Sequence, residues 1–176
     1  MSYLVFQVSL LVLIFMLVST LRKRISLVLD KTRINTFVLY ILSSFIFILM
    51  EEQINCQPAW CLKTVIPPTV PFLLAQTLVV YLVAELLWRY KAMSSAEADN
   101  LVVLLLAILY GVFGVLWEYF LGQAGKALFA QGPISASFFV LYVMASYILI
   151  VLVPLTVLEV RHVKHRTDDA PTRHKD

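Results

Sequence analysis

Apolar residues along the chain gather into five long stretches separated by short polar segments. Each stretch holds about 20 residues, the length that an α-helix needs to cross the hydrocarbon core of a bilayer. The pattern therefore predicts an all-α, polytopic integral membrane protein, folded as a bundle of five transmembrane helices. The predicted spans are residues 3–21, 34–50, 71–88, 101–121 and 137–160.

The composition favours a membrane protein over a soluble one. Of the 176 residues, 61% are hydrophobic and only 14% are charged, which is more apolar surface than a soluble domain of this length can bury. The spans leave little chain for a second domain, so residues 1–160 are predicted to form one transmembrane domain. Residues 161–176 are polar and mixed in charge, and we expect them to form a disordered cytoplasmic tail.

Lysine and arginine residues predict how the spans are oriented. An outside N-terminus with five spans leaves only Lys63 and Lys126 outside and places the other twelve of the 14 basic residues in the cytoplasm. Basic residues favour the cytoplasmic side, so we expect a cytoplasmic C-terminus and a bacterial-type cytoplasmic (inner) membrane. Orientation accounts for the basic residues, and no basic groove with stacking aromatic residues is visible, so no nucleic-acid partner is expected.

The fourth predicted span begins the only glycine-rich part of the chain, since all five glycines lie between residues 111 and 132. At about 100° per residue, several small residues and Glu118 fall within roughly 80° of one helix face. Such a face lets another helix, a partner subunit or a lipid approach closely, and we expect the fourth span to be central in the bundle. The predicted packing face consists of Ala107, Gly111, Gly114, Gly122 and Gly125.

Three carboxylates form a candidate site. Glu118 lies inside the fourth span, where a charge is costly unless it faces protein or water. The predicted topology places it at the same level as Glu51 and Glu52, near the outer surface. Such a group can handle protons or cations, or act as acid and base on a lipid. The alternative is an interfacial Glu118 that is hydrated or bonded to the hydroxyl of Tyr119 or Tyr147.

Two further pairs favour structural roles. Glu85 and Arg89 are four residues apart at a helix end, a spacing that predicts an ion pair. Cys56 and Cys61 lie in a predicted outer segment, where an oxidising compartment favours a disulfide. Free thiols, or a redox or metal role, are the alternatives for the cysteines.

Histidine placement argues against a metal or haem site inside the bundle. All three histidines fall in the predicted tail, so no metal and no cofactor is expected. They are His162, His165 and His174.

Function is predicted only as a set of classes, because common nucleotide-binding, hydrolase and zinc-protease motifs are missing from the sequence. The first class is a small non-enzymatic accessory, assembly or protective subunit that recognises another membrane protein or a lipid. The second is a proton- or cation-coupled transporter that uses Glu118 with Glu51 or Glu52. The third is a membrane enzyme acting on a lipid or isoprenoid at the outer surface. Membrane lipids and a membrane-protein partner or second copy are the expected partners.

Overall fold

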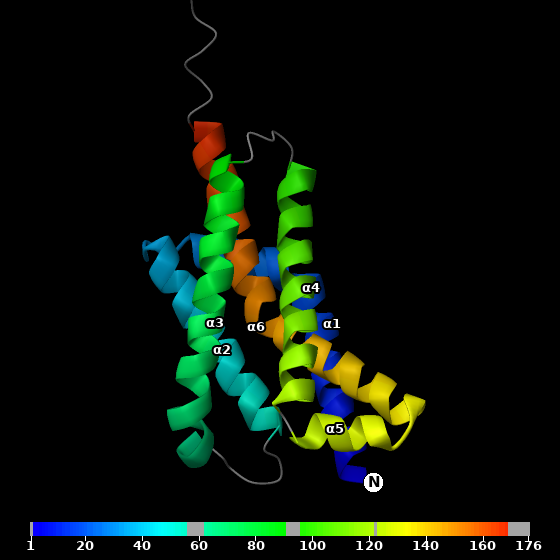
Figure 1. Ribbon diagram of the computed structural model, residues 1–176. Coiled ribbons are helices and arrows are strands. Elements are labelled where there is room, and N and C mark those ends of the chain that lie inside the picture. Colours follow the sequence, from blue (N-terminus) through cyan, green and yellow to red (C-terminus); the bar gives the residue numbers. More distant parts are fainter. Residues whose placement is uncertain (1, 56–61, 91–95, 122, 169–176) are drawn as a thin grey trace, which may run out of the picture.

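The computed structural model describes residues 2–55, 62–90, 96–121 and 123–168, and these ranges contain helices and no strand (Figure 1). The predicted all-α class is therefore confirmed for the described chain. The helices are α1 (Ser2–Asp30), α2 (Thr36–Asn55), α3 (Leu62–Tyr90), α4 (Ala96–Phe120), α5 (Gln123–Ala130) and α6 (Pro133–Asp168).

Four of the described helices are long and apolar enough to cross a membrane. They correspond to the second, third, fourth and fifth predicted spans, and they make the chain a membrane-embedded helix bundle. α1, which contains the first predicted span, is not one of the four. The membrane-crossing segments are Thr36–Ile54, Thr69–Trp88, Asp99–Phe120 and Pro133–Val163.

Several predicted boundaries are wrong because polar or proline-containing segments continue as helix. α1 runs on to Asp30, through residues that were predicted to form a polar link. α3 begins at Leu62, nine residues before the predicted span, and includes Pro67, Pro68 and Pro71. Proline removes one N–H donor but is tolerated in helices of membrane proteins, where neighbouring groups can bond the carbonyl that it leaves open.

The segment after α4 is also more ordered than predicted. A short helix, α5, occupies the segment between the fourth and fifth predicted spans and lies across one end of the bundle (Figure 1). Gly132 then adopts a φ of 114°, a left-handed conformation that favours glycine, and lets the chain turn into α6. α6 extends to Asp168, so the first half of the predicted disordered tail is helical.

α6, and not α4, is the central helix. It contacts all five other helices, and its residues 149–159 are all buried. Leu149, Val153 and Val157 pack with residues of α1 and α2, whereas neighbouring positions pack with residues of α2, α3 and α4. A helix that is apolar on every side is suited to this place, because it has no polar face to expose. Pro154 lies inside α6 without ending it.

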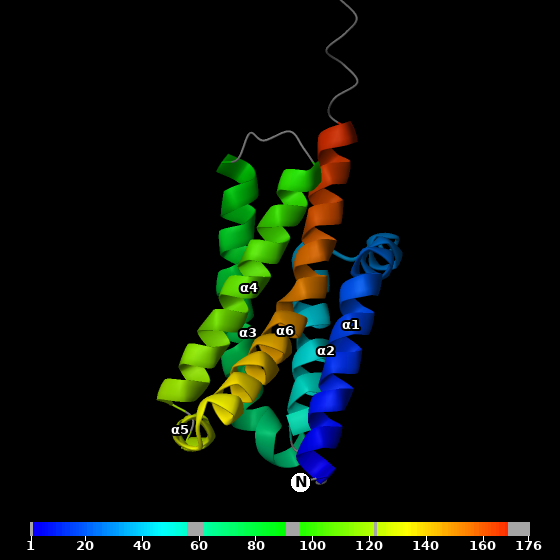
Figure 2. The ribbon, with the colours of Figure 1, turned by 90° about the vertical axis from the view of Figure 1, so that its right-hand side faces the viewer.

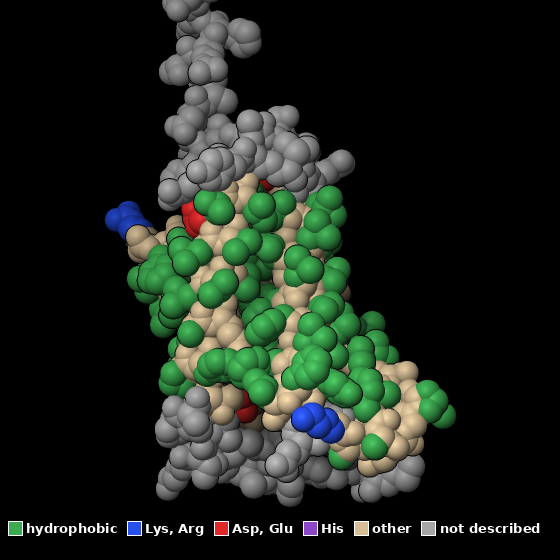
Figure 3. All heavy atoms as spheres, in the orientation of Figure 1, with side chains coloured by type: hydrophobic (Ala, Val, Ile, Leu, Met, Phe, Trp, Pro, Cys, Tyr) green, Lys and Arg blue, Asp and Glu red, His purple; other side chains and the backbone are tan. Residues whose placement is uncertain are grey.

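The long helices alternate in direction along the bundle (Figure 2). The N-terminus and α5 lie at one end, and the C-terminal end of α6 lies at the other. On the face shown in Figure 3, hydrophobic side chains cover the middle, and acidic and basic side chains appear only toward the two ends. This distribution matches a bundle whose middle faces hydrocarbon.

Candidate functional site

The three carboxylates singled out in the sequence lie at one end of the bundle. Glu51 and Glu52 are in the last turns of α2, and Glu118 is in the last turn of α4; both helices finish at the same end of the bundle (Figures 1 and 2). The carboxylates of Glu52 and Glu118 are close enough to interact electrostatically. Glu51 is only 7% exposed, while Glu52 and Glu118 are half-buried.

Tyr147 of α6 connects this carboxylate cluster to the packing face of α4. Its hydroxyl donates a hydrogen bond to Glu118 Oε1 at 3.1 Å. A Cβ atom at Gly114 would overlap the Tyr147 ring, so the missing side chain at that position makes room for the tyrosine. Gly114 and Glu118 are four residues apart, so they lie on the same face of α4 and both contact Tyr147. Of the two hydroxyls considered for Glu118, the structure selects Tyr147.

Tyr110 and Gln76 extend the cluster into the bundle and were missed in the sequence. The Tyr110 hydroxyl donates to Gln76 Oε1 at 3.2 Å, and its ring centroid lies 5.5 Å from that of Tyr147. Glu51 interacts electrostatically with Tyr110 and Tyr147. The helical spacing of Tyr110, Gly114 and Glu118 is the signal that places the tyrosine on the same face.

The predicted packing face is shorter than expected. Ala107 and Gly111 are buried, and Gly111 faces Ile148 and the Met144 carbonyl of α6. α4 ends at Phe120, so Gly125 belongs to α5 and not to this face. Gly122 lies outside the described residues.

Two other predicted pairs cannot be placed in this arrangement. Cys56 and Cys61 lie outside the described residues, so their disulfide stays a prediction. Glu85 is half-buried on α3, but the Arg89 side chain is outside the described part, and the ion pair stays a prediction too. Within the described ranges, no three His, Cys, Asp or Glu side chains are grouped to hold a metal ion.

A second polar cluster, at the opposite end, was not predicted. Arg22 Nη2 donates to Asn100 Oδ1 at 2.6 Å, and Lys23 Nζ lies 4.0 Å from Glu159 Oε1. Glu159 is buried and also interacts electrostatically with Arg22 and Asp99. These contacts join α1, α4 and α6. The basic residues after the first apolar stretch therefore hold helices together, besides any role in orientation.

Arg161 organises the turn between α1 and α2. Its Nε lies 3.2 Å from Asp30 Oδ1 in a mostly buried ion pair. Nη1 donates to the Ile34 carbonyl and the Thr36 hydroxyl, and Nη2 donates to the Thr32 carbonyl, at 2.7 to 3.1 Å. One guanidinium thus contacts four acceptors on the α1–α2 turn.

Carboxylates and phenol hydroxyls can exchange protons or supply oxygen ligands to a cation. The carboxylate cluster of Glu51, Glu52 and Glu118 is the only described place where the predicted site residues meet. Comparisons of the chain with protein-family models, curated proteins and solved structures find no match.

Proposed function

We propose that the chain is a five-span, non-enzymatic accessory subunit that recognises another membrane protein through its apolar outer surface. In this proposal α1 is the fifth span. Its Leu11 and Val18 pack against α6, while Leu13, Met16 and Leu17 are 65%, 63% and 57% exposed on other faces. An exposed apolar face of this kind suits contact with hydrocarbon.

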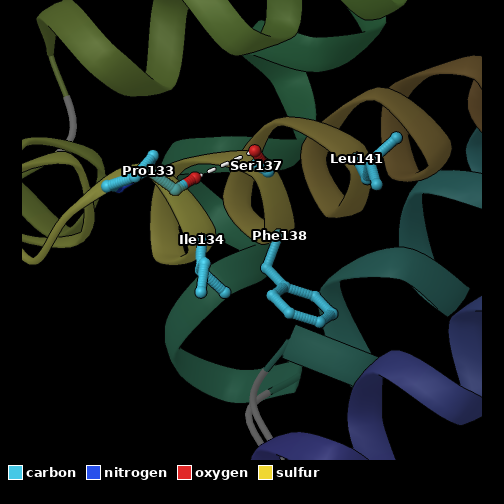
Figure 4. Close-up of a pocket in the computed structure, with 5 residues that line it drawn as sticks. All are labelled: Pro133, Ile134, Ser137, Phe138 and Leu141. Carbon is cyan, nitrogen blue, oxygen red and sulfur yellow. Dashed lines mark hydrogen bonds between the residues drawn. The ribbon is translucent and has the colours of Figure 1, made fainter.

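The observation that carries the proposal is the apolar surface at the start of α6. Ile134, Phe138 and Leu141 are 74%, 60% and 67% exposed, and with Pro133 and Ser137 they line a shallow groove of about 330 Å³ (Figure 4). The three apolar residues follow the i, i+4, i+7 spacing of a helix-packing face. The first part of α6 therefore presents a packing face on the outside of the bundle.

The chemistry of the groove supports an apolar occupant. The Ser137 hydroxyl already donates a hydrogen bond to the Pro133 carbonyl at 2.9 Å. Its only hydrogen atom is therefore not offered to a ligand in the groove. An apolar transmembrane helix of a partner protein, packed along Ile134, Phe138 and Leu141, is the occupant that we propose. Helices in membranes associate by such close packing.

Co-purification from native membranes tests this proposal. A triple variant, Ile134→Ala with Phe138→Ala and Leu141→Ala, removes the packing face and keeps it apolar. We expect a stoichiometric partner to co-purify with the unsubstituted chain and to be reduced at least about tenfold in the variant, a loss that corresponds to about 1.4 kcal/mol.

The matched control is the triple variant Leu13→Ala, Met16→Ala and Leu17→Ala, which changes an equally exposed face of α1. It is expected to keep the partner. The proposal is wrong if no stoichiometric partner is found, if only lipid is retained, or if both triple variants lose the partner equally.

A second candidate function, proton or cation transport, is favoured by the carboxylate cluster. The Tyr147 hydroxyl bonds Glu118, Glu52 interacts with Glu118, and the buried Glu51 faces the same tyrosine. These groups come from three helices, α2, α4 and α6. A carboxylate shared among helices in this way can couple a bound ion to helix movement.

Glu118→Gln separates the two functions, because it removes the charge and keeps the size of the side chain. For a transporter, proton or cation flux into proteoliposomes should be abolished while the thermal midpoint in detergent is retained. Glu85→Gln, on α3, is the control and should leave flux unchanged. If Glu118→Gln changes only stability, or nothing, the carboxylate has a packing role and transport is excluded.

A further inference from the structure

The α1–α2 corner, residues 22–35, carries exposed basic side chains with no ion pair among the described residues. Arg24, Lys31 and Arg33 are exposed, whereas Arg22 and Lys23 contact other helices. Figure 3 shows basic side chains projecting from the side of the molecule where this corner lies. We infer that the α1–α2 corner binds the phosphate headgroup of an anionic phospholipid.

Apolar side chains lie directly beside these charges. Arg24, Val28 and Lys31 follow the i, i+4, i+7 spacing of one helix face, and Leu27 and Val28 are exposed between the two basic residues. This arrangement suits a lipid, because the basic groups can bind its phosphate while the apolar groups contact its acyl chains. A soluble anion would use only the charges.

The corner is rigid enough to hold the basic groups in place. Arg161 bonds Asp30, Thr32, Ile34 and Thr36, so the backbone between Lys31 and Arg33 is fixed on both sides. Preorganised binding groups lose less conformational entropy when a ligand binds. Lys31 and Arg33 are therefore held on one bonded turn, and Arg24 lies about two helical turns earlier on α1.

This site is separate from the groove at the start of α6, because the α1–α2 corner and α5 lie toward opposite ends of the bundle (Figures 1 and 2). Lipid binding at the corner and partner binding at the groove can therefore succeed or fail independently.

Lipid titration of the purified full chain in detergent tests the inference. The probes are phosphatidylglycerol, phosphatidylcholine of the same acyl chains, and inorganic phosphate. Native mass spectrometry counts bound lipid, and thermal midpoints report stabilisation. We expect the chain to retain and be stabilised by phosphatidylglycerol, with little effect of phosphatidylcholine or phosphate, and to lose this preference in 1 M salt because charges are screened.

The test variant combines R24Q, K31Q and R33Q, which are exposed positions and leave the Arg161 contacts intact. Each lost charge is expected to weaken phosphatidylglycerol binding by about fivefold, and the triple variant by on the order of 100-fold. K126Q, an exposed lysine at the other end of the bundle, is the control and should bind as the unsubstituted chain does.

The inference is overturned if the triple variant binds phosphatidylglycerol normally or if K126Q weakens binding equally. It is also overturned if phosphatidylcholine binds as well as phosphatidylglycerol, since charge is then irrelevant. Stabilisation by inorganic phosphate at the level of the lipid would assign a soluble anion and reject the lipid.

Discussion

At the scale of single residues, the most informative feature is the pairing of a missing side chain with a carboxylate. Gly114 makes room for the Tyr147 ring, and Glu118, one helical turn further on, accepts the tyrosine hydroxyl. Both α4 residues stand out in the sequence, one as part of a small face and one as an intramembrane acid. Their common partner comes from α6 and could not be chosen from sequence, because Tyr119 and Tyr147 were equally plausible.

The two buried glycines of α4 should respond differently to alanine. A Cβ at Gly114 would overlap the Tyr147 ring, which is also hydrogen-bonded to Glu118 and in contact with the Tyr110 ring. We therefore expect Gly114→Ala to lower the free energy of unfolding by about 1–3 kcal/mol. A Cβ at Gly111 lies 2.9 Å from Ile148 Cγ1 and 3.2 Å from the Met144 carbonyl oxygen, which are longer distances than those at Gly114. The gain in helix propensity, about 1 kcal/mol, offsets part of this crowding, so Gly111→Ala should lower stability by less than Gly114→Ala.

Reversible unfolding in mixed detergent and denaturant measures both variants side by side. Equal stability of Gly114→Ala and Gly111→Ala would contradict the close approach of Tyr147 to α4.

At the scale of helices, the α1–α2 turn depends on one side chain from a distant part of the chain. Arg161 lies more than 120 residues from the turn and bonds four of its acceptors. In the sequence it is simply the first basic residue after the last span. The contact exists only because the C-terminal turns of α6 run past the end of α1.

Arg161→Gln should loosen this turn. The Arg161 side chain is 11% exposed, and its truncation breaks the ion pair with Asp30 and three hydrogen bonds to the turn, so we expect a loss of about 3 kcal/mol in the free energy of unfolding. Tryptic cleavage after Lys31 and Arg33 should become faster, which mass spectrometry of the fragments can follow.

Lys23→Gln is the control for this experiment. Its side chain is 59% exposed and lies 4.0 Å from Glu159, so the expected loss is less than about 1 kcal/mol. Equal protease resistance of Arg161→Gln and the unsubstituted chain would show that Arg161 does not hold the turn.

At the scale of the whole molecule, the number of spans decides which sides the two termini occupy. The four apolar helices α2, α3, α4 and α6 account for an even number of crossings. A fifth crossing by α1 would place the N-terminus and C-terminus on opposite sides of the membrane. The excess of basic residues at one end predicts that the C-terminus is cytoplasmic.

Epitope tags at the two termini test this topology in intact cells. With five spans, an impermeant antibody should label the N-terminal tag without permeabilisation and the C-terminal tag only after it. Labelling of both tags under one condition would show four crossings and would make α1 a helix that packs on the bundle without spanning. The reverse pattern would contradict the predicted orientation.

The sequence by itself determined the helical class, the membrane-crossing segments of α2, α3, α4 and α6, and the carboxylates of a candidate site. Length and hydropathy are local properties, so they can be read without knowing which helices meet. Helix continuity was less predictable, because the polar end of α1, the prolines of α3 and the eight residues of α5 are stabilised by context that a local pattern does not contain.

The tertiary structure alone decided which helix is central and which side chains become partners. α6 takes the centre because its residues 149–159 are buried between two groups of helices, although α4 carries the more conspicuous small face. Tyr147 reaches Glu118, and Arg161 reaches the α1–α2 turn, through helix packing. Which helix faces meet depends on the combined burial of all the helices, and no single stretch of sequence determines it.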